Sequence, residues 1–168
     1  MAVQIQVAGK ATVRVDTGDG SGLQALGVTI NGVQITEEVF IGDVHGDLHG
    51  GDEGPVIDRQ YFGEVHKIRC EFSRYDQDVA ARVARRVAGT TTSGTVAEAN
   101  IGDLYIQEGK TMRVVIDTAN DTQERNYPLC IPDEPVELNK GTKFTTLVMN
   151  FEGHRNQTSG LLYDRTSS

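Results

Sequence analysis

The sequence has few of the residues that build disulfide frameworks, metal ribbons or membrane spans. Its two cysteines, Cys70 and Cys130, lie far apart and form no CxxC pair, so neither a disulfide scaffold nor a zinc ribbon is indicated. Each cysteine lies in an apolar or alternating segment that suits a free buried thiol, and a disulfide between the two stays open. No apolar run approaches the ~20 residues that cross a bilayer, so we expect no membrane anchor. The N-terminal segment MAVQIQVAGK lacks the features of a secretion signal, which predicts folding in the cytoplasm.

Positive charge is also scarce. Lysine and arginine number 16 against 24 aspartates and glutamates, which gives a formal net charge of −8 at pH 7. Nucleic-acid binders draw their affinity from basic side chains that neutralise phosphates, so this balance argues against an ordinary nucleic-acid binder. It is compatible with a surface to which nucleic acid does not adhere, and equally with simple solubility.

Glycine, by contrast, is abundant. The 19 glycines indicate many turns and loops and favour a β architecture over a helical bundle. A chain of 168 residues fits one domain that needs no metal or disulfide to hold its core. We therefore predict a single mainly β domain over residues 1–168, a β sandwich or barrel with one flanking α-helix, a long β hairpin and extended loop and termini. Residues 1–20 are expected to form an N-terminal arm or strand, and residues 153–168 a C-terminal tail.

Three segments alternate between apolar and polar residues, which is the pattern of half-buried strands. The inward positions that this alternation predicts are His66, Ile68, Cys70 and Phe72, then Met112, Val114 and Ile116, and finally Leu147, Met149 and Phe151. RNYPLCIP at 125–132 carries Pro128 and Pro132, so an edge strand or a short irregular strand is expected there.

One helix is predicted over residues 76–88. Asp76 can serve as its N-cap, the apolar residues Val79, Val83 and Val87 recur every four residues, and Gly89 closes the pattern. The apolar face of valines and alanines is narrow, which predicts a helix that lies flat against a sheet.

The dipeptide Asn31-Gly32 stands between two β-rich runs, LGVTI and VQITEEVFI. Asn-Gly is the preferred chemistry of a type I′ turn, so we predict a tight hairpin in which Val28 and Ile30 face Val33 and Ile35. The segment 42–58 that follows has five glycines and no lysine or arginine, and it is predicted to be a polar loop.

That segment contains the one motif that resembles an active site. Gly42-Asp43-Val44-His45-Gly46 resembles the first metal motif of the metallophosphoesterases, in which an Asp and a His hold one of two metals that activate water. The GDxxDRG and GNHE motifs that complete such a site do not occur, so the chain is interpreted as a protein that is not an enzyme and needs no cofactor. A weaker hypothesis is that a single divalent cation binds to this loop, although the EF-hand spacing is missing. Its candidate ligands are Asp43, His45, Asp47, His49, Asp52 and Glu53.

The order of elements over residues 20–152 resembles a known family. A β hairpin, a long loop, a strand ending in EFSRYD, one short helix and a late β half closing on TTLVMNFEG are similar to the phage tail tube protein family and to related tail and baseplate proteins. The resemblance implies a hexameric ring of β barrels, stacked into a hollow tube through which DNA passes. It also implies that residues 37–64 reach an adjacent ring and that both chain ends reach across subunits.

The resemblance further implies where the protein acts and with what. Its location would be the virion tail, assembled in the host cytoplasm, and its partners would be copies of itself with sheath, tape measure, baseplate and terminator proteins. The residues assigned to assembly are Val28, Ile30, Asn31, Gly32, Val33, Ile35, Asp43 and Asp52. Neck, baseplate and capsid decoration roles stay open within the same class. A metal-dependent phosphoesterase and a small cation- or ligand-binding β domain are the hypotheses of other classes.

Overall fold

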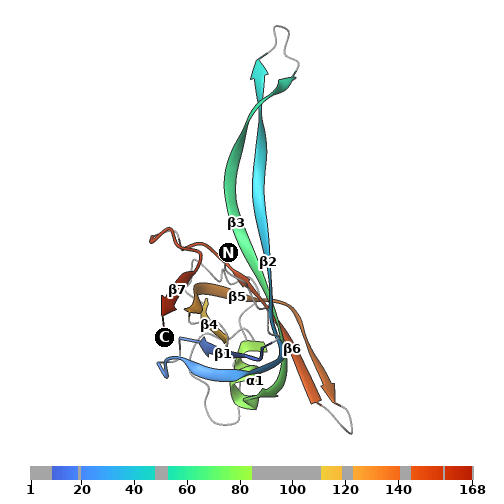
Figure 1. The fold of residues 1–168 in the computed structure, drawn as a ribbon, viewed down its shortest axis with the longest axis vertical. Coiled ribbons are helices and arrows are strands. Elements are labelled where there is room, and N and C mark those ends of the chain that lie inside the picture. Colours follow the sequence, from blue (N-terminus) through green and yellow to red (C-terminus); the bar gives the residue numbers. More distant parts are fainter. Residues whose placement is uncertain are drawn as a thin grey trace, which may run out of the picture.

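The computed structural model describes residues 9–18, 20–47, 53–84, 111–118, 123–140, 145–156 and 158–167. The described residues form seven strands and one helix (Figure 1). In chain order these are β1 (Ala11–Asp16), β2 (Gln24–Asp47), β3 (Glu53–Tyr75), α1 (Gln77–Ala84), β4 (Met112–Thr118), β5 (Gln123–Lys140), β6 (Thr145–Gly153) and β7 (Asp164–Ser167).

The strands close into a barrel. Hydrogen bonding follows the order β4-β1-β2-β3-β6-β5-β7, and an additional pairing between β4 and β5 joins the two ends of the six-stranded part. Every pairing is antiparallel. Closure removes the unpaired edges that an open sheet would present to solvent. The prediction of a mainly β barrel with one helix is confirmed.

The barrel interior is filled as the alternation predicted. His66, Ile68, Cys70 and Phe72 are all buried, whereas Arg69 and Glu71 between them are exposed. The inward positions predicted on β4 and β6 are buried as well. Burying apolar surface contributes about 25 cal/mol per Å², so these positions dominate the stability of the barrel. The alternation did not predict Val115 and Val148, which are also buried although they occupy the opposite positions of their strands.

Helix α1 begins as predicted. The Asp76 carboxylate accepts hydrogen bonds from the backbone N–H groups of Asp78 and Val79 at 2.9 and 3.0 Å, which is N-cap geometry. Val79, Ala80 and Val83 are buried in the barrel core, so the narrow apolar face packs against strands as expected. The predicted end of the helix near Gly89 lies outside the described residues.

The predicted turn at Asn31-Gly32 is wrong. Strand β2 continues through these residues, and its register with β3 shifts between Thr29 and Val33. Gly32 has φ +90°, a backbone conformation that either a type I′ turn or a β-bulge can use, and here it serves a bulge. Val28 and Ile30 therefore do not face Val33 and Ile35, and the latter two pack against the core of their own barrel.

The predicted loop over 42–58 is also wrong. Residues 42–47 belong to β2 and residues 53–58 belong to β3, and the two strands pair along almost their whole length. A long hairpin therefore exists, and residues 48–52, which join its two strands in the sequence, lie outside the described residues. Glycine and aspartate are depleted in strands, and their abundance here led to the prediction of a loop.

Strand β5 corrects a third expectation. It spans 18 residues and pairs with β4, β6 and β7, so it is neither short nor an edge. Pro128 falls where the register with β4 shifts between Met112 and Val114, so its missing N–H is placed at an irregularity. The predicted C-terminal tail is likewise tied to the barrel, because Leu162 is buried and β7 pairs with β5.

The outer part of the β2–β3 hairpin leaves the barrel as an arm (Figure 1). Strand β1 pairs with β2 only up to Val28, and β6 pairs with β3 only from His66 onward. Residues 37–47 and 53–65, here called the arm, therefore pair only with each other among the described residues. At about 3.3 Å per residue the eleven residues from 37 to 47 extend roughly 33 Å.

Replacing Gly32 with valine tests the bulge. A β-branched residue at φ +90° is strained, and its Cβ would lie 3.2 Å from the Gly9 carbonyl oxygen. We expect Gly32→Val to lower the free energy of unfolding by about 1–3 kcal/mol, measured by urea denaturation. Gly32→Asn should cost less, because asparagine tolerates positive φ. Equal midpoints for wild type and Gly32→Val would contradict the bulge.

Candidate assembly surface

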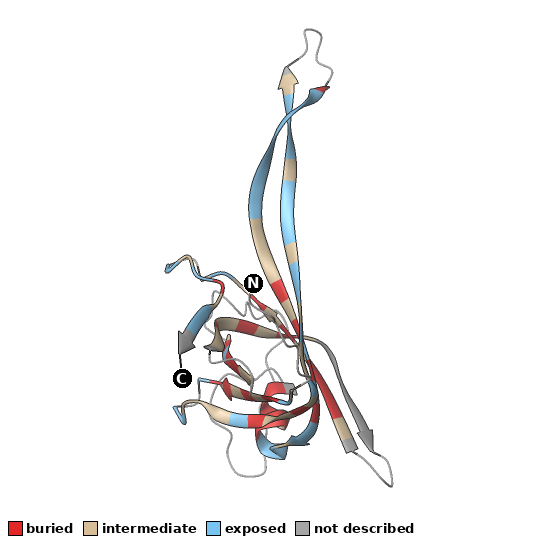
Figure 2. Cartoon of the chain, in the orientation of Figure 1, coloured by how far each residue is buried: buried red, intermediate tan, exposed pale blue. Residues whose placement is uncertain are grey.

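The arm concentrates the exposed apolar surface of the described residues. Outside the arm, Leu161 is the one large hydrophobic side chain among them that is exposed. Figure 2 shows the arm as predominantly exposed, in contrast to the buried interior of the barrel. The exposed apolar side chains of the arm are Val39, Phe40, Ile41, Val44, Val56, Ile57, Tyr61 and Phe62.

These side chains occupy both faces of the hairpin. Residues paired across two strands share a face, so Ile41 lies with its partner Tyr61 on one face, and Val44 lies with Asp58 on the other. Phe62 covers Gly42 on the second face, where a Cβ at that glycine would clash with the phenyl ring. The arm is therefore apolar on two opposite sides.

Such an arm cannot bury its own apolar surface. A two-stranded hairpin has no interior, and an isolated hairpin is at best marginally stable in water. Its backbone edges are also unpaired over the described residues of the arm. Apolar patches and free strand edges of this kind mark surfaces that other protein chains cover.

The motif resembling a metal site lies on this arm. The Asp43 carboxylate pairs with Arg59 at 3.2 Å, and His45 Nδ1 lies 2.9 Å from the Gly54 carbonyl oxygen, so His45 donates a cross-strand hydrogen bond. Among the described residues no group of three His, Cys, Asp or Glu side chains is placed to hold a metal ion. His49 and Asp52, with the side chains of Asp47 and Glu53, lie outside the description. The described part of the motif thus serves the pairing of the two strands.

A groove of about 340 Å³ lies at the root of the arm. It is lined by Phe40, Phe62, Gly63, Glu64 and Val65 of the arm and by His154 and Arg155, which follow β6. Arg155 Nε donates a hydrogen bond to the Gly160 carbonyl oxygen at 2.7 Å and so braces the turn that follows. The groove combines an apolar floor with a rim that carries both charges. We call it the root groove.

Beside the root groove, buried polar and aromatic groups join the arm to the barrel. His66 is 2% exposed, and its Nδ1 lies 3.1 Å from the Tyr127 hydroxyl. The ring of Tyr163 lies 5.4 Å from that of His66 and 5.6 Å from that of Tyr127, which ties the C-terminal segment to the same joint. Gly153 is opposite His66, and its missing side chain leaves room for the Tyr127 ring.

Burial controls the ionisation of this joint. Desolvation lowers the pKa of His66, and this effect outweighs the nearby Glu37 and Glu64 carboxylates that would raise it. Burial also raises the pKa of Tyr127 to about 12. His66 and Tyr127 are therefore both neutral at pH 7.

The two cysteines are free, buried and part of the core. Burial raises the pKa of the Cys70 thiol to about 12 and raises that of Cys130 as well. A thiol acts as a nucleophile only when it is deprotonated, so neither cysteine is poised for chemistry.

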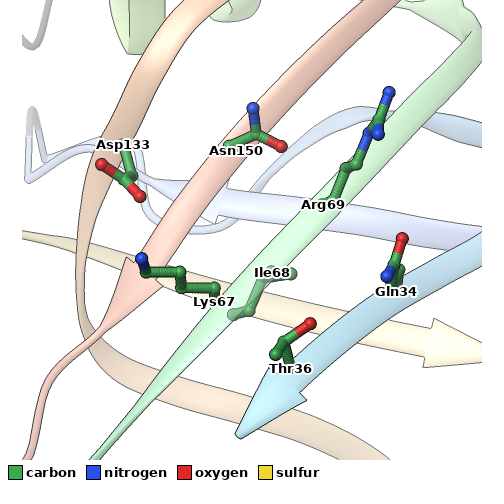
Figure 3. A pocket seen from close by; sticks show the side chains of 7 residues that line it. All are labelled: Gln34, Thr36, Lys67, Ile68, Arg69, Asp133 and Asn150. Atoms are coloured by element: carbon green, nitrogen blue, oxygen red, sulfur yellow. The ribbon is translucent and has the colours of Figure 1, made fainter. Parts of the chain in front are cut away.

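A second, polar groove of about 180 Å³ lies on the outer side of the barrel (Figure 3). Its lining residues are Gln34, Thr36, Lys67, Ile68, Arg69, Asp133 and Asn150. Lys67 Nζ lies 3.3 Å from Glu38, and this hydrogen bond, helped by Asp133, raises the pKa of Lys67. Figure 3 shows the ammonium group of Lys67 directed toward Asp133. Mixed charges and amides of this kind suit a face in contact with water.

The assembly residues chosen from the sequence divide into two groups. Val28, Ile30, Asn31, Gly32, Val33 and Ile35 lie in the barrel part of β2, Asp43 lies on the arm, and Asp52 is outside the described residues. The exposed apolar residues of the arm were not named individually, although the segment 37–64 that contains them was expected to reach an adjacent ring. Consecutive apolar residues, as in VFI and YF, place apolar side chains on both faces of a strand, and this signal was present in the sequence.

No helix among the described residues is long and apolar enough to cross a membrane.

The buried His66 predicts a loss of stability in acid. Its folded pKa lies below the unfolded value of about 6.5, so between the two the unfolded chain binds a proton that the folded chain does not. The contribution of neutral His66 to the free energy of unfolding is therefore fully present above about pH 6.5. It is lost as the pH falls from there toward the lower pKa of the folded state. We expect a lower urea midpoint at pH 5.5 than at pH 7.5, and a smaller difference between the two midpoints in His66→Gln. A pH dependence that persists in His66→Gln would contradict this assignment.

The sequence matches no protein-family model and no curated protein at a significant level. The fold, however, is similar to that of solved chains. A chain of the anti-feeding prophage baseplate, in a six-fold symmetrised cryo-EM structure, matches over 99% of this chain and 98% of that chain, with a TM-score of 0.55 and 6% identity. A chain of the native gene transfer agent virion matches over 94% of this chain and 95% of that chain, with a TM-score of 0.50 and 11% identity. A chain from the tail of the empty gene transfer agent particle, computed with C6 symmetry, matches over 94% of both chains, with a TM-score of 0.49 and 10% identity. The first two of these matches confirm, at the level of the fold, the resemblance to phage tail and baseplate proteins that the order of elements indicated.

Proposed function

We propose that this chain is a structural subunit of a phage-like tail, and that it forms hexameric rings that stack into a tube around a channel for DNA. Each barrel would form part of a ring wall, and each arm would extend to a neighbouring copy. The partners of the subunit would first be other copies of itself, and then the sheath, tape measure, baseplate and terminator proteins of the tail. Its location would be the tail of the virion.

The observation that carries this proposal is the arm. It places eight exposed apolar side chains on a two-stranded hairpin outside the closed barrel, where the described part of its own chain does not cover them. Covering one face would leave the opposite face in water, so burial of the whole arm needs neighbours on both sides. A repeating array of copies supplies such neighbours, because each subunit meets identical subunits in more than one direction.

The similar folds and the charge support the same proposal. The baseplate structure that contains a similar chain is six-fold symmetrised, which supports six copies in a ring. The net charge of −8 disfavours tight binding of DNA, and a channel has to let DNA pass without retaining it.

A ring in a baseplate is the second candidate function, because the first of the similar structures comes from a baseplate. The two roles differ in how assembly ends. A tube subunit adds rings without a fixed limit, whereas a baseplate component stops at one ring or a small stack. Negative-stain microscopy of the assembled protein separates them by the presence or absence of long tubes of constant width.

The phosphoesterase hypothesis has less support. Asp43 is paired with Arg59, and His45 is bonded to the backbone of the opposite strand, so neither is oriented by further metal ligands among the described residues. We propose that the protein is not an enzyme. Phosphatase activity that needs a divalent metal and disappears in His45→Ala would contradict this.

Removing apolar surface from the arm tests the proposed function. We expect Ile57→Ser combined with Phe62→Ser to abolish assembly or raise its critical concentration at least tenfold, because each exposed side chain would contribute about 1–2 kcal/mol of burial between subunits. Light scattering and microscopy measure the assembly. The control is Leu161→Ser, which removes a 51% exposed apolar side chain outside the arm and should leave assembly unchanged. Normal assembly of the arm variant would contradict the proposal.

A further inference from the structure

The composition of the root groove matches that of another surface of the same chain, the outer half of the arm. Its floor is apolar, with Phe40 and Phe62 exposed by 50% and 66%, and Arg155 stands exposed at its rim. Exposed phenyl rings of this kind are stabilised when an apolar surface covers them. Glu64 also lines the groove, but it pairs with Val39 across the hairpin, so its side chain lies on the face opposite Phe40. An occupant that covers the phenyl rings and reaches Arg155 therefore needs apolar side chains beside a negative charge.

The outer half of the arm has this composition. Val44 and its cross-strand partner Asp58 lie on one face of the hairpin, and Ile57 lies beside Gly46 next to them. All three side chains are exposed. The segment 42–58 contains five acidic residues and neither lysine nor arginine, so it is the acidic end of the arm.

Phe62 covers Gly42, and Val44 lies two residues further along β2 on the same face, so the two surfaces are neighbours on one hairpin and a single chain cannot fold one over the other. The outer half and the root belong to the same pair of extended strands, which run continuously from one to the other. Only the arm of another copy can place Val44 and Ile57 over Phe40 and Phe62. Opposite charges at the edge of such a contact would fix its register and speed its formation.

We propose that the root groove binds the outer half of the arm of a second copy, with Val44 and Ile57 on the phenylalanines and Asp58 beside Arg155. The proposal rests on the proposed function and names the contact through which neighbouring subunits recognise one another. The competing occupants, a different tail protein or a small apolar ligand, are outcomes of the test below.

Charge reversal tests the pairing between copies. Asp58→Arg alone and Arg155→Glu alone place like charges in every contact, and we expect each variant to raise the critical concentration for assembly at least threefold in low salt. An equimolar mixture of the two variants should restore assembly to within about twofold of wild type. In the mixture, the arginine introduced at position 58 of one variant contacts the glutamate introduced at position 155 of the other. In the reverse contact, the unchanged Asp58 of the second variant meets the unchanged Arg155 of the first.

Restoration by mixing is the decisive readout, because a charge pair within one chain cannot be repaired by a second chain. Arg155 also braces a turn through Gly160, and Asp58 accepts a hydrogen bond from the Arg59 backbone N–H, so thermal melting of both variants checks the fold. If both variants assemble like wild type, or if the mixture stays impaired, the groove has another occupant and this proposal is overturned. If wild-type protein itself fails to assemble under all conditions, the proposed function fails instead.

Discussion

A two-stranded hairpin has two faces and no interior, and this constraint governs the rest of the molecule. The arm carries phenylalanine, tyrosine, isoleucine and valine on both faces, so it is stable in water only with neighbours on each side. The barrel, in contrast, buries its own apolar residues and closes its own edges through the β4–β5 pairing. The chain thus combines a barrel that covers its own core with an arm whose apolar faces the described residues leave exposed, and we propose that other copies cover them.

The barrel determines how the arm is held. Strands β2 and β3 are shared between both parts, so the arm begins with no flexible linker. The bulge at Gly32 lets β2 continue along β3 after its pairing with β1 ends. His66, Tyr127 and Tyr163 then join the arm root, β5 and the C-terminal segment. A rigid connection of this kind allows an array to repeat with constant geometry, because the direction of each arm follows from the position of its barrel.

The sequence predicted the barrel better than the arm. Alternation identified the inward residues from His66 to Phe72 because one side of that strand is buried in the chain itself. The same signal was absent over 37–64, where both faces are available to partners and apolar residues follow one another directly. Asn31-Gly32 was misinterpreted because positive φ serves a turn or a bulge equally well, and only the pairing partners decide between them. The weak hypothesis of a cation site in this segment stays a prediction, and the spacing of Asp43 and His45 contains no information about the cross-strand bonds that engage them.

Hydrogen exchange of backbone amides, compared between dilute and assembled protein, is the sharpest test of whether other copies stabilise the arm. We expect arm amides in residues 37–47 and 53–65 to exchange much faster than barrel amides in dilute protein. Assembly should slow them by at least about a hundredfold, or ~2.7 kcal/mol. Barrel amides of β1 and β4 should change little. Arm amides that are as protected as the barrel in dilute protein, or that do not slow on assembly, would contradict the dependence of the arm on its neighbours.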